Sequence, residues 1–430
     1  MKQPSLIKLT GLVLVTVLSS VIARADVPIF ENKISLYGYA AGSLAFQQDK
    51  FLRGIPSDTA SPFALDAAKL GAAFDFDPVT AKLSVYAPSS RLDSQSNPDN
   101  IYLLEANVTY AMRSDTKITF GRFQSSIGYE PFDIPNGSFI TAGTGDSMNA
   151  PGLNVIPNFQ EGLKVEGTFD KYSYGLSFVD SIYNAPSKPF RGDGSLSNGF
   201  GFELFGNYHG DNFSGHLSVG YQKRKNSIDV TDTFYDNMGV LIGDGTKTVD
   251  FDTDTWIVDI YGEYKVPDSK VTLGLEGVWR SDDPIATQHA QTVIVDGQEF
   301  SLLDQRLSAY NNRVNTYFGL AMMKYQFSDP FFLAFRFSAG KKQAQTSNSQ
   351  TGAMNPDTGL VEYMRPDGVM VLFYKYTMAA SYTVNKNVEI RAEGSATDYM
   401  KTNIIDPVTR TSVKQISDSF YAGVQVILKF

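Results

Sequence analysis

Apolar and polar side chains alternate along much of the chain from residue 34 onward, with a period of two residues. The clearest case is the C-terminal stretch, where every second position from Phe420 to Phe430 is apolar and the positions between them are mixed. This period is typical of a β-strand with one apolar face and one more polar face. The pattern predicts a strand that runs to the last residue, Phe430.

The same alternation predicts sixteen strands and no helix. In the fourth of these strands it places Tyr102, Leu104 and Ala106 on the outward face, and Glu105 and Asn107 on the inward face. The predicted strands span about residues 34–46, 64–76, 79–87, 101–112, 116–123, 162–169, 172–180, 200–208, 213–222, 255–265, 270–280, 314–327, 331–340, 368–382, 388–399 and 418–430.

Short and long connections alternate between these strands. The even-numbered strands are followed by a few Asp, Asn, Gly, Pro or Ser residues, which suit tight turns. The odd-numbered strands are followed by longer connections, such as 223–254, 281–313 and 341–367. Short periplasmic turns and long extracellular loops are typical of transmembrane barrels. The predicted fold class is therefore all-β, a transmembrane antiparallel β-barrel of about sixteen strands.

The N-terminal segment has the features of a secretory signal peptide. Lys2 and Lys8 precede an apolar run over residues 9–22, and Ala23-Arg24-Ala25 follows as a small-x-small cleavage pattern. The run is shorter than the roughly 20 apolar residues that a membrane-spanning helix needs. We expect cleavage of residues 1–25, which leaves residues 26–430 as a single barrel domain.

Composition agrees with a barrel in the outer membrane. The chain has 13% aromatic residues and no cysteine, so disulfides cannot tie down its backbone. Closed β-pairing does so, and in a bilayer only helices and closed barrels satisfy every backbone group. Aromatic residues fall near the predicted strand ends, as in the aromatic girdles of such barrels, with Tyr264, Tyr325 and Tyr382 at the periplasmic rim and Trp279 near the outer rim.

The charge balance excludes some classes of partner. The formal net charge is −9, which disfavours nucleic acid as a partner. A mild preference for cations in an aqueous lumen fits this balance, although total charge is a poor measure of lumen charge. Only residues 26–33 precede the first strand, which is too little for the plug of a 22-stranded transporter.

The residue types and their spacing give little support for an enzyme active site or a metal site. His209, His216 and His289 have no cysteine or second histidine at ligand spacing, which argues against a zinc site. Asp250 to Asp254 begin like a calcium loop, but Thr255 and Tyr261 stand where that loop needs Gly and Glu. We therefore expect no enzyme, no cofactor and no metal, with a loose surface cation site as the alternative at this acidic stretch.

Three segments resemble a known group of proteins. They are Ser35-Leu36-Tyr37-Gly38-Tyr39, Thr119-Phe120-Gly121-Arg122-Phe123 and Ile127-Gly128-Tyr129-Glu130. With the spacing of the strands around them, they resemble the OmpL-like outer-membrane β-barrel porins, also called β-barrel porin type 2. The resemblance covers most of the mature chain and implies a passive or weakly selective channel. It brings no site residues with it.

This resemblance implies a set of partners. A porin sits among outer-membrane lipid and lipopolysaccharide and passes small solutes, and its C-terminal aromatic residue, here Phe430, is recognised by the barrel-assembly machinery. A homotrimer is common among sixteen-stranded porins. The alternative function is a structural or adhesive outer-membrane barrel whose extracellular loops bind a partner.

Charged side chains of both signs fall on the inward face of the predicted strands, which fits water and not a packed core. The candidates for lining the lumen are Lys82, Glu105, Glu166, Asp259 and Glu276.

The connection over residues 124–161 is the third long loop and the longest, and it is rich in apolar residues that something must bury. By analogy with trimeric porins, we expect it to fold into the barrel and narrow the lumen. Charges of opposite sign facing across a narrow aqueous gap would then screen solutes. The candidates for this constriction are Glu130, Asp133 and Asp146 on the loop and Arg336, Lys375 and Arg391 on the opposing wall.

A second interpretation of this loop stays open. The loop could pack over the barrel mouth or against a neighbouring subunit, and the basic residues could simply pair with Glu389 and Glu393.

Overall fold

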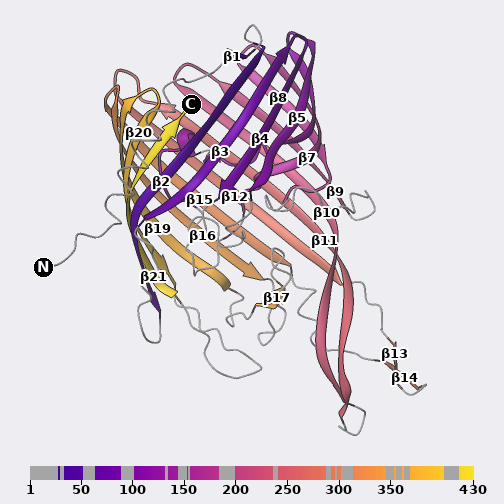
Figure 1. Ribbon diagram of the computed structural model, residues 1–430. Helices are drawn as coiled ribbons and strands as arrows, with labels where there is room; N and C mark the ends of the chain where they lie inside the picture. The colour runs from indigo at the N-terminus through magenta and orange to yellow at the C-terminus, as the bar shows by residue number, and fades with distance from the viewer. Residues whose placement is uncertain are drawn as a thin grey trace, which may run out of the picture.

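Sixteen antiparallel strands close into one barrel in the computed structural model (Figure 1). The closure joins the two ends of the chain, because β2 pairs with β21 along its length, with Tyr39 opposite Lys429 and Gln48 opposite Phe420. The structure describes residues 28–29, 33–51, 63–88, 101–130, 134–143, 153, 155–183, 199–235, 241–286, 292–295, 298–301, 313–344, 353–354, 361–362, 369–400 and 416–430.

Each barrel strand pairs with the strands next to it in the chain. The barrel strands are β2 (Ile34–Phe51), β3 (Phe63–Phe76), β4 (Val79–Pro88), β5 (Tyr102–Arg113), β6 (Thr116–Gln124), β7 (Phe159–Phe169), β8 (Tyr172–Val179), β9 (Gly199–His209), β10 (Phe213–Tyr235), β11 (Leu241–Lys265), β12 (Val271–Ala286), β15 (Val314–Ser328), β16 (Phe331–Ala344), β19 (Val369–Asn385), β20 (Val388–Tyr399) and β21 (Ile416–Lys429). Short pieces do not belong to this ring of strands, namely β1 (Pro28–Ile29), β13 (Thr292–Val295), β14 (Gln298–Ser301), β17 (Ala353–Met354), β18 (Val361–Glu362) and the 3-10 turn η1 (Ile134–Asn136).

The predicted strands are confirmed, with one large difference at β10 and β11. Residues 223–254 were expected to be a loop, but the two strands continue as a paired ribbon in which Ser227 lies opposite Asp250. Pairing with β9 ends at Arg224, so among the described residues no strand pairs with most of this ribbon on the β9 side. Figure 1 shows the ribbon reaching well beyond the barrel. The sequence of the ribbon alternates β-branched and polar residues. β-Branched residues favour strands, so β10 and β11 continue to pair with each other beyond the barrel.

The predicted outward position of Tyr102 and Leu104 is wrong. The pairing between β4 and β5 passes from Ser84–Glu105 directly to Val85–Leu103, which leaves Leu104 as the extra residue of a β-bulge. A bulge shifts the alternation by one position, so Tyr102 turns inward and packs against Tyr86 with 5.4 Å between the ring centroids. Both Tyr102 and Leu104 are buried in one cluster with Tyr39 and Phe159.

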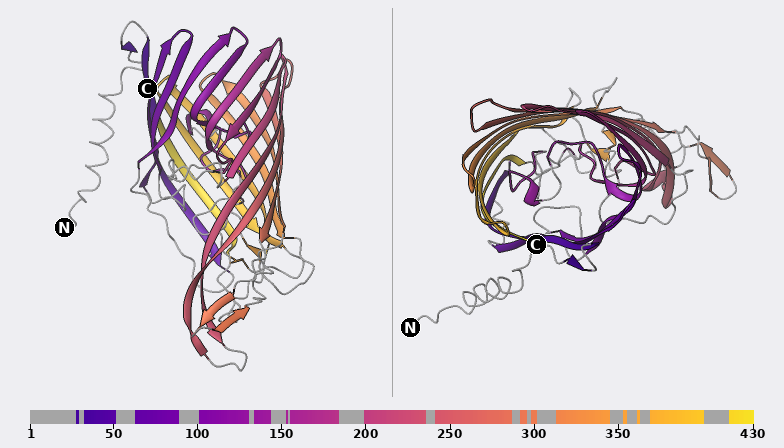
Figure 2. Two further views of the ribbon diagram at one scale, coloured as in Figure 1. Left: turned by 90° about the vertical axis from the view of Figure 1, so that its right-hand side faces the viewer. Right: turned by 90° about the horizontal axis from the view of Figure 1, so that it is seen from above.

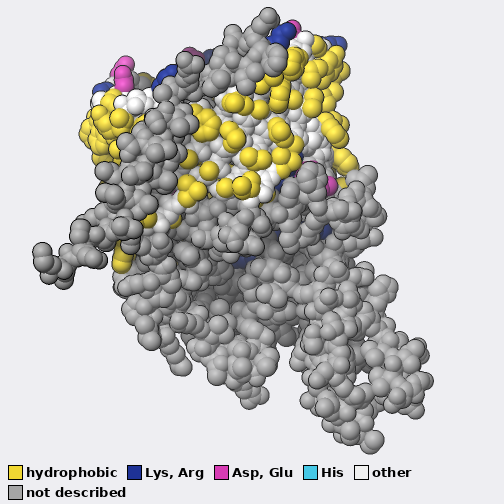
Figure 3. Space-filling view, in the orientation of Figure 1, with side chains coloured by type: hydrophobic (Ala, Val, Ile, Leu, Met, Phe, Trp, Pro, Cys, Tyr) yellow, Lys and Arg dark blue, Asp and Glu magenta, His cyan; other side chains and the backbone are white. Residues whose placement is uncertain are grey.

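The two faces of the barrel differ in polarity. Outward side chains are apolar and exposed, for example Phe120 at 68% and Leu275 at 64% of their surface. Figure 3 shows such side chains spread over the outer wall, with charged side chains at its upper rim. Inward polar side chains such as Gln425 and Ser218 are fully buried. The alternation that predicted the strands therefore separates a lipid-facing surface from a polar interior.

Tight turns gather at one end of the barrel, where the C-terminus also lies (Figure 1). Asp170 and Asp268 adopt positive φ angles of 51° and 55° there, in the left-handed region that Asp tolerates in turns. We call this the short-turn end. Among the residues that the structure describes, no helix is long and apolar enough to cross a membrane.

Candidate functional site

The described residues of the third loop, which connects β6 to β7 over residues 125–158, turn back into the barrel. Viewed along the barrel axis, its purple trace lies inside the ring of strands (Figure 2). Its described residues contact inward-facing side chains of β9, β11, β12, β16, β19 and β20.

Two wall carboxylates bind the start of the loop through its backbone. The Gly128 N–H donates to Asp259 Oδ2 at 2.7 Å, and the Tyr129 N–H donates to Glu276 Oε1 at 2.8 Å. Gly128 has a φ of +108°, and a Cβ there would lie 2.6 Å from Ile156. Only glycine fits this position easily. The Asp259 and Glu276 predicted to line the lumen therefore anchor the loop.

Two further wall carboxylates bind the loop, one at its start and one at its middle. Glu203 accepts from the Ser125 hydroxyl at 2.6 Å, next to the end of β6. Glu393 accepts from the Ile140 N–H at 2.5 Å and from the Thr141 hydroxyl at 2.5 Å. All four wall carboxylates, Glu203, Asp259, Glu276 and Glu393, are buried.

Arg336 lies in direct contact with the loop. Its guanidinium forms an ion pair with Glu130 and donates to the Thr141 carbonyl oxygen at 2.8 Å. It also stacks over the Phe139 ring, 4.3 Å from the centroid. Glu130 in turn accepts from the Gly143 N–H at 2.7 Å. These two predicted residues meet as an ion pair in which Arg336 is buried and Glu130 is partly exposed, whereas we expected them to face each other across water.

Lys375 and Arg391 also hold the loop through its carbonyl groups. Lys375 Nζ donates to the Ala142 carbonyl oxygen at 2.6 Å, and Arg391 donates to the Phe139 carbonyl oxygen at 3.0 Å. Arg391 pairs with Glu389 at 2.7 Å as well. Both basic side chains are buried. The two remaining candidates of the predicted constriction, Asp133 and Asp146, lie outside the described residues.

Apolar side chains of the loop pack against an apolar stretch of the inner wall. Ile127, Leu153 and Val155 are almost fully buried there. Phe139 packs separately against Ala334 and Ala379. The wall residues of the first cluster are Ile257, Val278, Val314, Phe318, Leu320, Val371, Phe373 and Tyr399.

The other lumen candidates lie on the opposite part of the wall, near the short-turn end. Glu105 pairs with Lys69 at 3.0 Å. Glu166 lies between Lys117 and Lys164, at 3.4 and 3.5 Å. Lys82 is exposed and alternates with the outward-facing Leu83.

Tyr129 adds a side-chain anchor that the sequence did not single out. Its hydroxyl donates to Glu263 Oε2 at 3.1 Å. Burial, together with the charge of Glu263, raises the pKa of Tyr129 above its ordinary value. The phenol therefore stays protonated and able to donate this bond. No periodicity points to such a residue, because its partner lies 134 positions away along the chain.

His216 faces inward, as expected from its strand. Its ring stacks on Tyr261 with 4.4 Å between centroids and bonds to Asn207 at 2.5 Å. Within the described ranges, no group of three His, Cys, Asp or Glu side chains is arranged to hold a metal ion.

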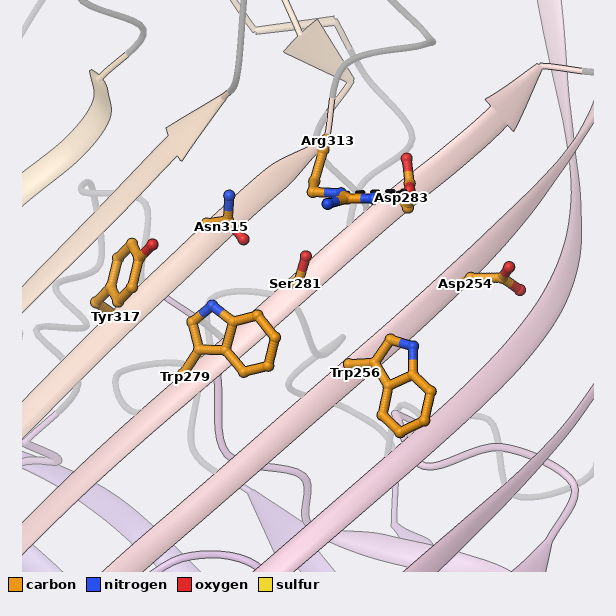
Figure 4. A pocket seen from close by; sticks show the side chains of 8 residues that line it. All are labelled: Asp254, Trp256, Trp279, Ser281, Asp283, Arg313, Asn315 and Tyr317. Atoms are coloured by element: carbon orange, nitrogen blue, oxygen red, sulfur yellow. Dashed lines mark hydrogen bonds and ion pairs between the residues drawn. The ribbon is translucent and has the colours of Figure 1, made fainter.

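A pocket of about 490 Å³ lies on the outer face of the barrel, away from the lumen. Trp256, Trp279 and Tyr317 line it on β11, β12 and β15, and Arg313 pairs with Asp283 at 2.6 Å above them (Figure 4). The exposed aromatic rings lie below the charged groups in this view. Such an arrangement is typical of the level where the apolar outer surface of a barrel meets its polar rim.

Comparison with known proteins gives one family and a set of similar folds. The family model described as "Putative beta-barrel porin-2, OmpL-like" matches residues 33–430. No curated protein sequence matches the chain.

Solved structures of similar fold include three outer-membrane proteins. OmpT of Vibrio cholerae is 11% identical, with a TM-score of 0.54 over 94% of this chain and 100% of that one. OprB of Pseudomonas putida is 13% identical, with a TM-score of 0.53 over 93% and 95%. OmpF of Salmonella typhi is 12% identical, with a TM-score of 0.50 over 94% and 99%. At these identities the likeness concerns the fold alone.

Proposed function

The chain belongs to the OmpL-like beta-barrel porin-2 family, and from this premise we propose that its third loop narrows a water-filled lumen through which small hydrophilic solutes and ions diffuse passively. As a porin it is an outer-membrane channel and not an enzyme. A sixteen-stranded barrel is wide enough to leave an aqueous channel. The width of that channel therefore depends on what lies inside the barrel.

One observation carries the proposal: the loop is anchored inside the barrel on several sides at once. Its first residues bind Asp259 and Glu276, and its later residues bind Arg336 and Glu393. A segment held at both its beginning and its middle cannot swing out to the barrel mouth without breaking buried polar bonds. We therefore assign Glu130, Arg336, Lys375 and Arg391 the role of fixing the loop across the lumen.

The two other loop carboxylates remain constriction candidates in this proposal. Asp133 and Asp146 belong to the same loop and lie outside the described residues. Fixed charges at a constriction bias the solutes that pass.

The proposal includes the processing and assembly of the chain. Residues 1–25 form a leader that is removed, and residues 26–430 form one barrel domain. Phe430 presents the C-terminal signal to the barrel-assembly machinery, and three copies assemble as a homotrimer surrounded by outer-membrane lipid and lipopolysaccharide.

An adhesive function of the extracellular side is the second candidate. The ribbon formed by the far parts of β10 and β11 projects beyond the barrel (Figure 1) and offers a surface for a partner. This role does not require an open lumen, so a test of permeation separates the two functions.

The permeation test is swelling of proteoliposomes in neutral sugars of increasing size. The parent protein should admit small sugars and exclude large ones, and removal of residues 139–150 should shift the cut-off to larger sugars. Shortening the ribbon by replacing residues 228–249 with Asn-Gly is the matched control and should leave the cut-off unchanged. Liposomes that do not swell with folded parent protein would refute the channel, and an unchanged cut-off after loop removal would refute the constriction.

A further inference from the structure

We propose that the water-exposed part of the lumen prefers anionic solutes, although the chain as a whole is acidic. This inference rests on the proposed function, because it concerns the ions that pass through the same lumen. The inward charges of the described strands divide into those that face water and those that the third loop covers.

Lysines gather on the inner wall formed by β3 to β7, near the short-turn end. Lys82 is exposed and forms no ion pair with any residue that the structure describes. Lys117 has 53% of its side chain exposed and shares Glu166 with Lys164. One carboxylate cannot neutralise two ammonium groups, so this part of the wall carries excess positive charge. We call Lys82, Lys117 and Lys164 the vestibule lysines.

The wall formed by β15, β20 and β21 does not cancel this excess. Lys429 lies 2.7 Å from Glu389, which also binds the buried Arg391. Lys324 on β15 lies over the Phe332 ring, 4.0 Å from its centroid, and interacts with the charge of Glu263. Among the described residues of this wall, Glu389 and Glu263 therefore each have a basic neighbour, and they do not offset the vestibule lysines.

The wall carboxylates of the described strands that could reverse this balance are covered by the third loop. Asp259 and Glu276 accept backbone N–H groups of the loop, as do Glu203 and Glu393. All four are at least 90% buried, and in the described part of the chain no lysine or arginine forms an ion pair with them. The charges of these four carboxylates therefore interact with N–H groups of the loop and not with passing ions.

Turn residues at the short-turn end of the barrel carry charges of both signs and lie at its rim. Acidic ones include Asp77, Asp115 and Asp170, and basic ones include Arg113, Lys171 and Lys270. Because ion preference is set by fixed charges that line the water path, the acidic total of the chain does not predict the preference of the lumen.

Reversal potential across a planar bilayer in a KCl gradient tests this inference. We expect chloride to pass more readily than potassium, by about two- to fivefold, since partly screened charges in a wide lumen bias ions without excluding either sign. The preference should weaken as the salt concentration rises, because the Debye length falls from about 10 Å at 0.1 M to about 3 Å at 1 M.

Charge reversal of the vestibule lysines should invert the preference. The variant Lys82→Glu, Lys117→Glu, Lys164→Glu is compared with Lys171→Glu, Lys270→Glu, Lys386→Glu, which has the same net charge but changes only turn residues. The control should keep the chloride preference of the parent. A gentler variant, Glu166→Gln, adds no new contact and should strengthen the preference, so the inference stays testable if the triple variant does not fold.

The outcomes separate this inference from the proposed function. Folded parent protein without any current contradicts the channel itself. Conductance with a potassium preference, or a chloride preference that Glu166→Gln and the vestibule variant leave unchanged, overturns the anion inference while the channel stands.

Discussion

The ion pair between Arg336 and Glu130 is the residue-scale contact on which the position of the loop most depends. The guanidinium touches the loop three times, through Glu130, the Thr141 carbonyl and the Phe139 ring. Removing Arg336 leaves Glu130, whose side chain is 29% exposed, without its ion-pair partner and also removes the other two contacts.

Arg336→Met should therefore loosen the loop and raise single-channel conductance and open-channel noise. The double variant Arg336→Met, Glu130→Gln leaves no unpaired charge and should recover part of the lost stability, measured as the free energy of unfolding in urea. If the single variant conducts as quietly as the parent, Arg336 does not hold the loop.

A second residue-scale prediction concerns the seam where the barrel closes. The Gly38 N–H donates to the Phe430 carbonyl oxygen at 2.9 Å. A Cβ at Gly38 would lie 2.3 Å from the Lys69 carbonyl oxygen and 2.7 Å from the Phe430 ring. Gly38→Ala should destabilise the folded barrel by roughly 1–3 kcal/mol, as overpacking does.

The matched control for the seam is Gly394→Ala, since Gly394 lies on β20 with nothing within 4 Å of its added Cβ. This variant should be neutral or slightly stabilising, because Ala lowers the conformational entropy of the unfolded chain. Heat-dependent mobility of the folded band on a gel measures both. Equal melting of the two variants would show that the seam tolerates the extra atom.

At the scale of the elements, the strands were predictable and the contacts between them and the loop were not. The C-terminal strand β21 follows from its period alone, since one face meets lipid and the other water. The bulge at Leu104 leaves no trace in composition, so the positions of Tyr102 and Leu104 were missed. Gly128 and Tyr129 bind the wall through backbone N–H groups, which every residue except proline offers. Such anchors cannot be found from side-chain types.

The ribbon of β10 and β11 yields a prediction at the same scale. In the described part of the chain, most of it pairs with no barrel strand on the β9 side, and a two-stranded ribbon adds little stability in water. Replacing residues 228–249 with the two-residue turn Asn-Gly should change the free energy of unfolding by less than about 0.5 kcal/mol and leave conductance unchanged. A marked loss of unfolding free energy or of conductance would mean that the ribbon supports the barrel.

The whole molecule has a direction that can be tested on intact cells. The short turns lie at the end that holds the C-terminus, and the ribbon lies at the other end (Figure 1). In outer-membrane barrels the short turns face the periplasm. An epitope tag inserted at Asp244 should therefore be labelled on intact cells, whereas a tag at Asp170 should be labelled only after permeabilisation. The reverse pattern would invert the proposed orientation.

The central claim concerns the whole molecule as well: a water-filled barrel whose width is set by its third loop. Recording of single-channel current from the purified protein in a planar bilayer tests it most directly, with the variant that lacks residues 139–150 measured beside the parent. The account predicts stable conductance steps for the parent and larger steps for the variant. A folded parent that remains silent, or a folded variant whose steps equal those of the parent, would contradict it.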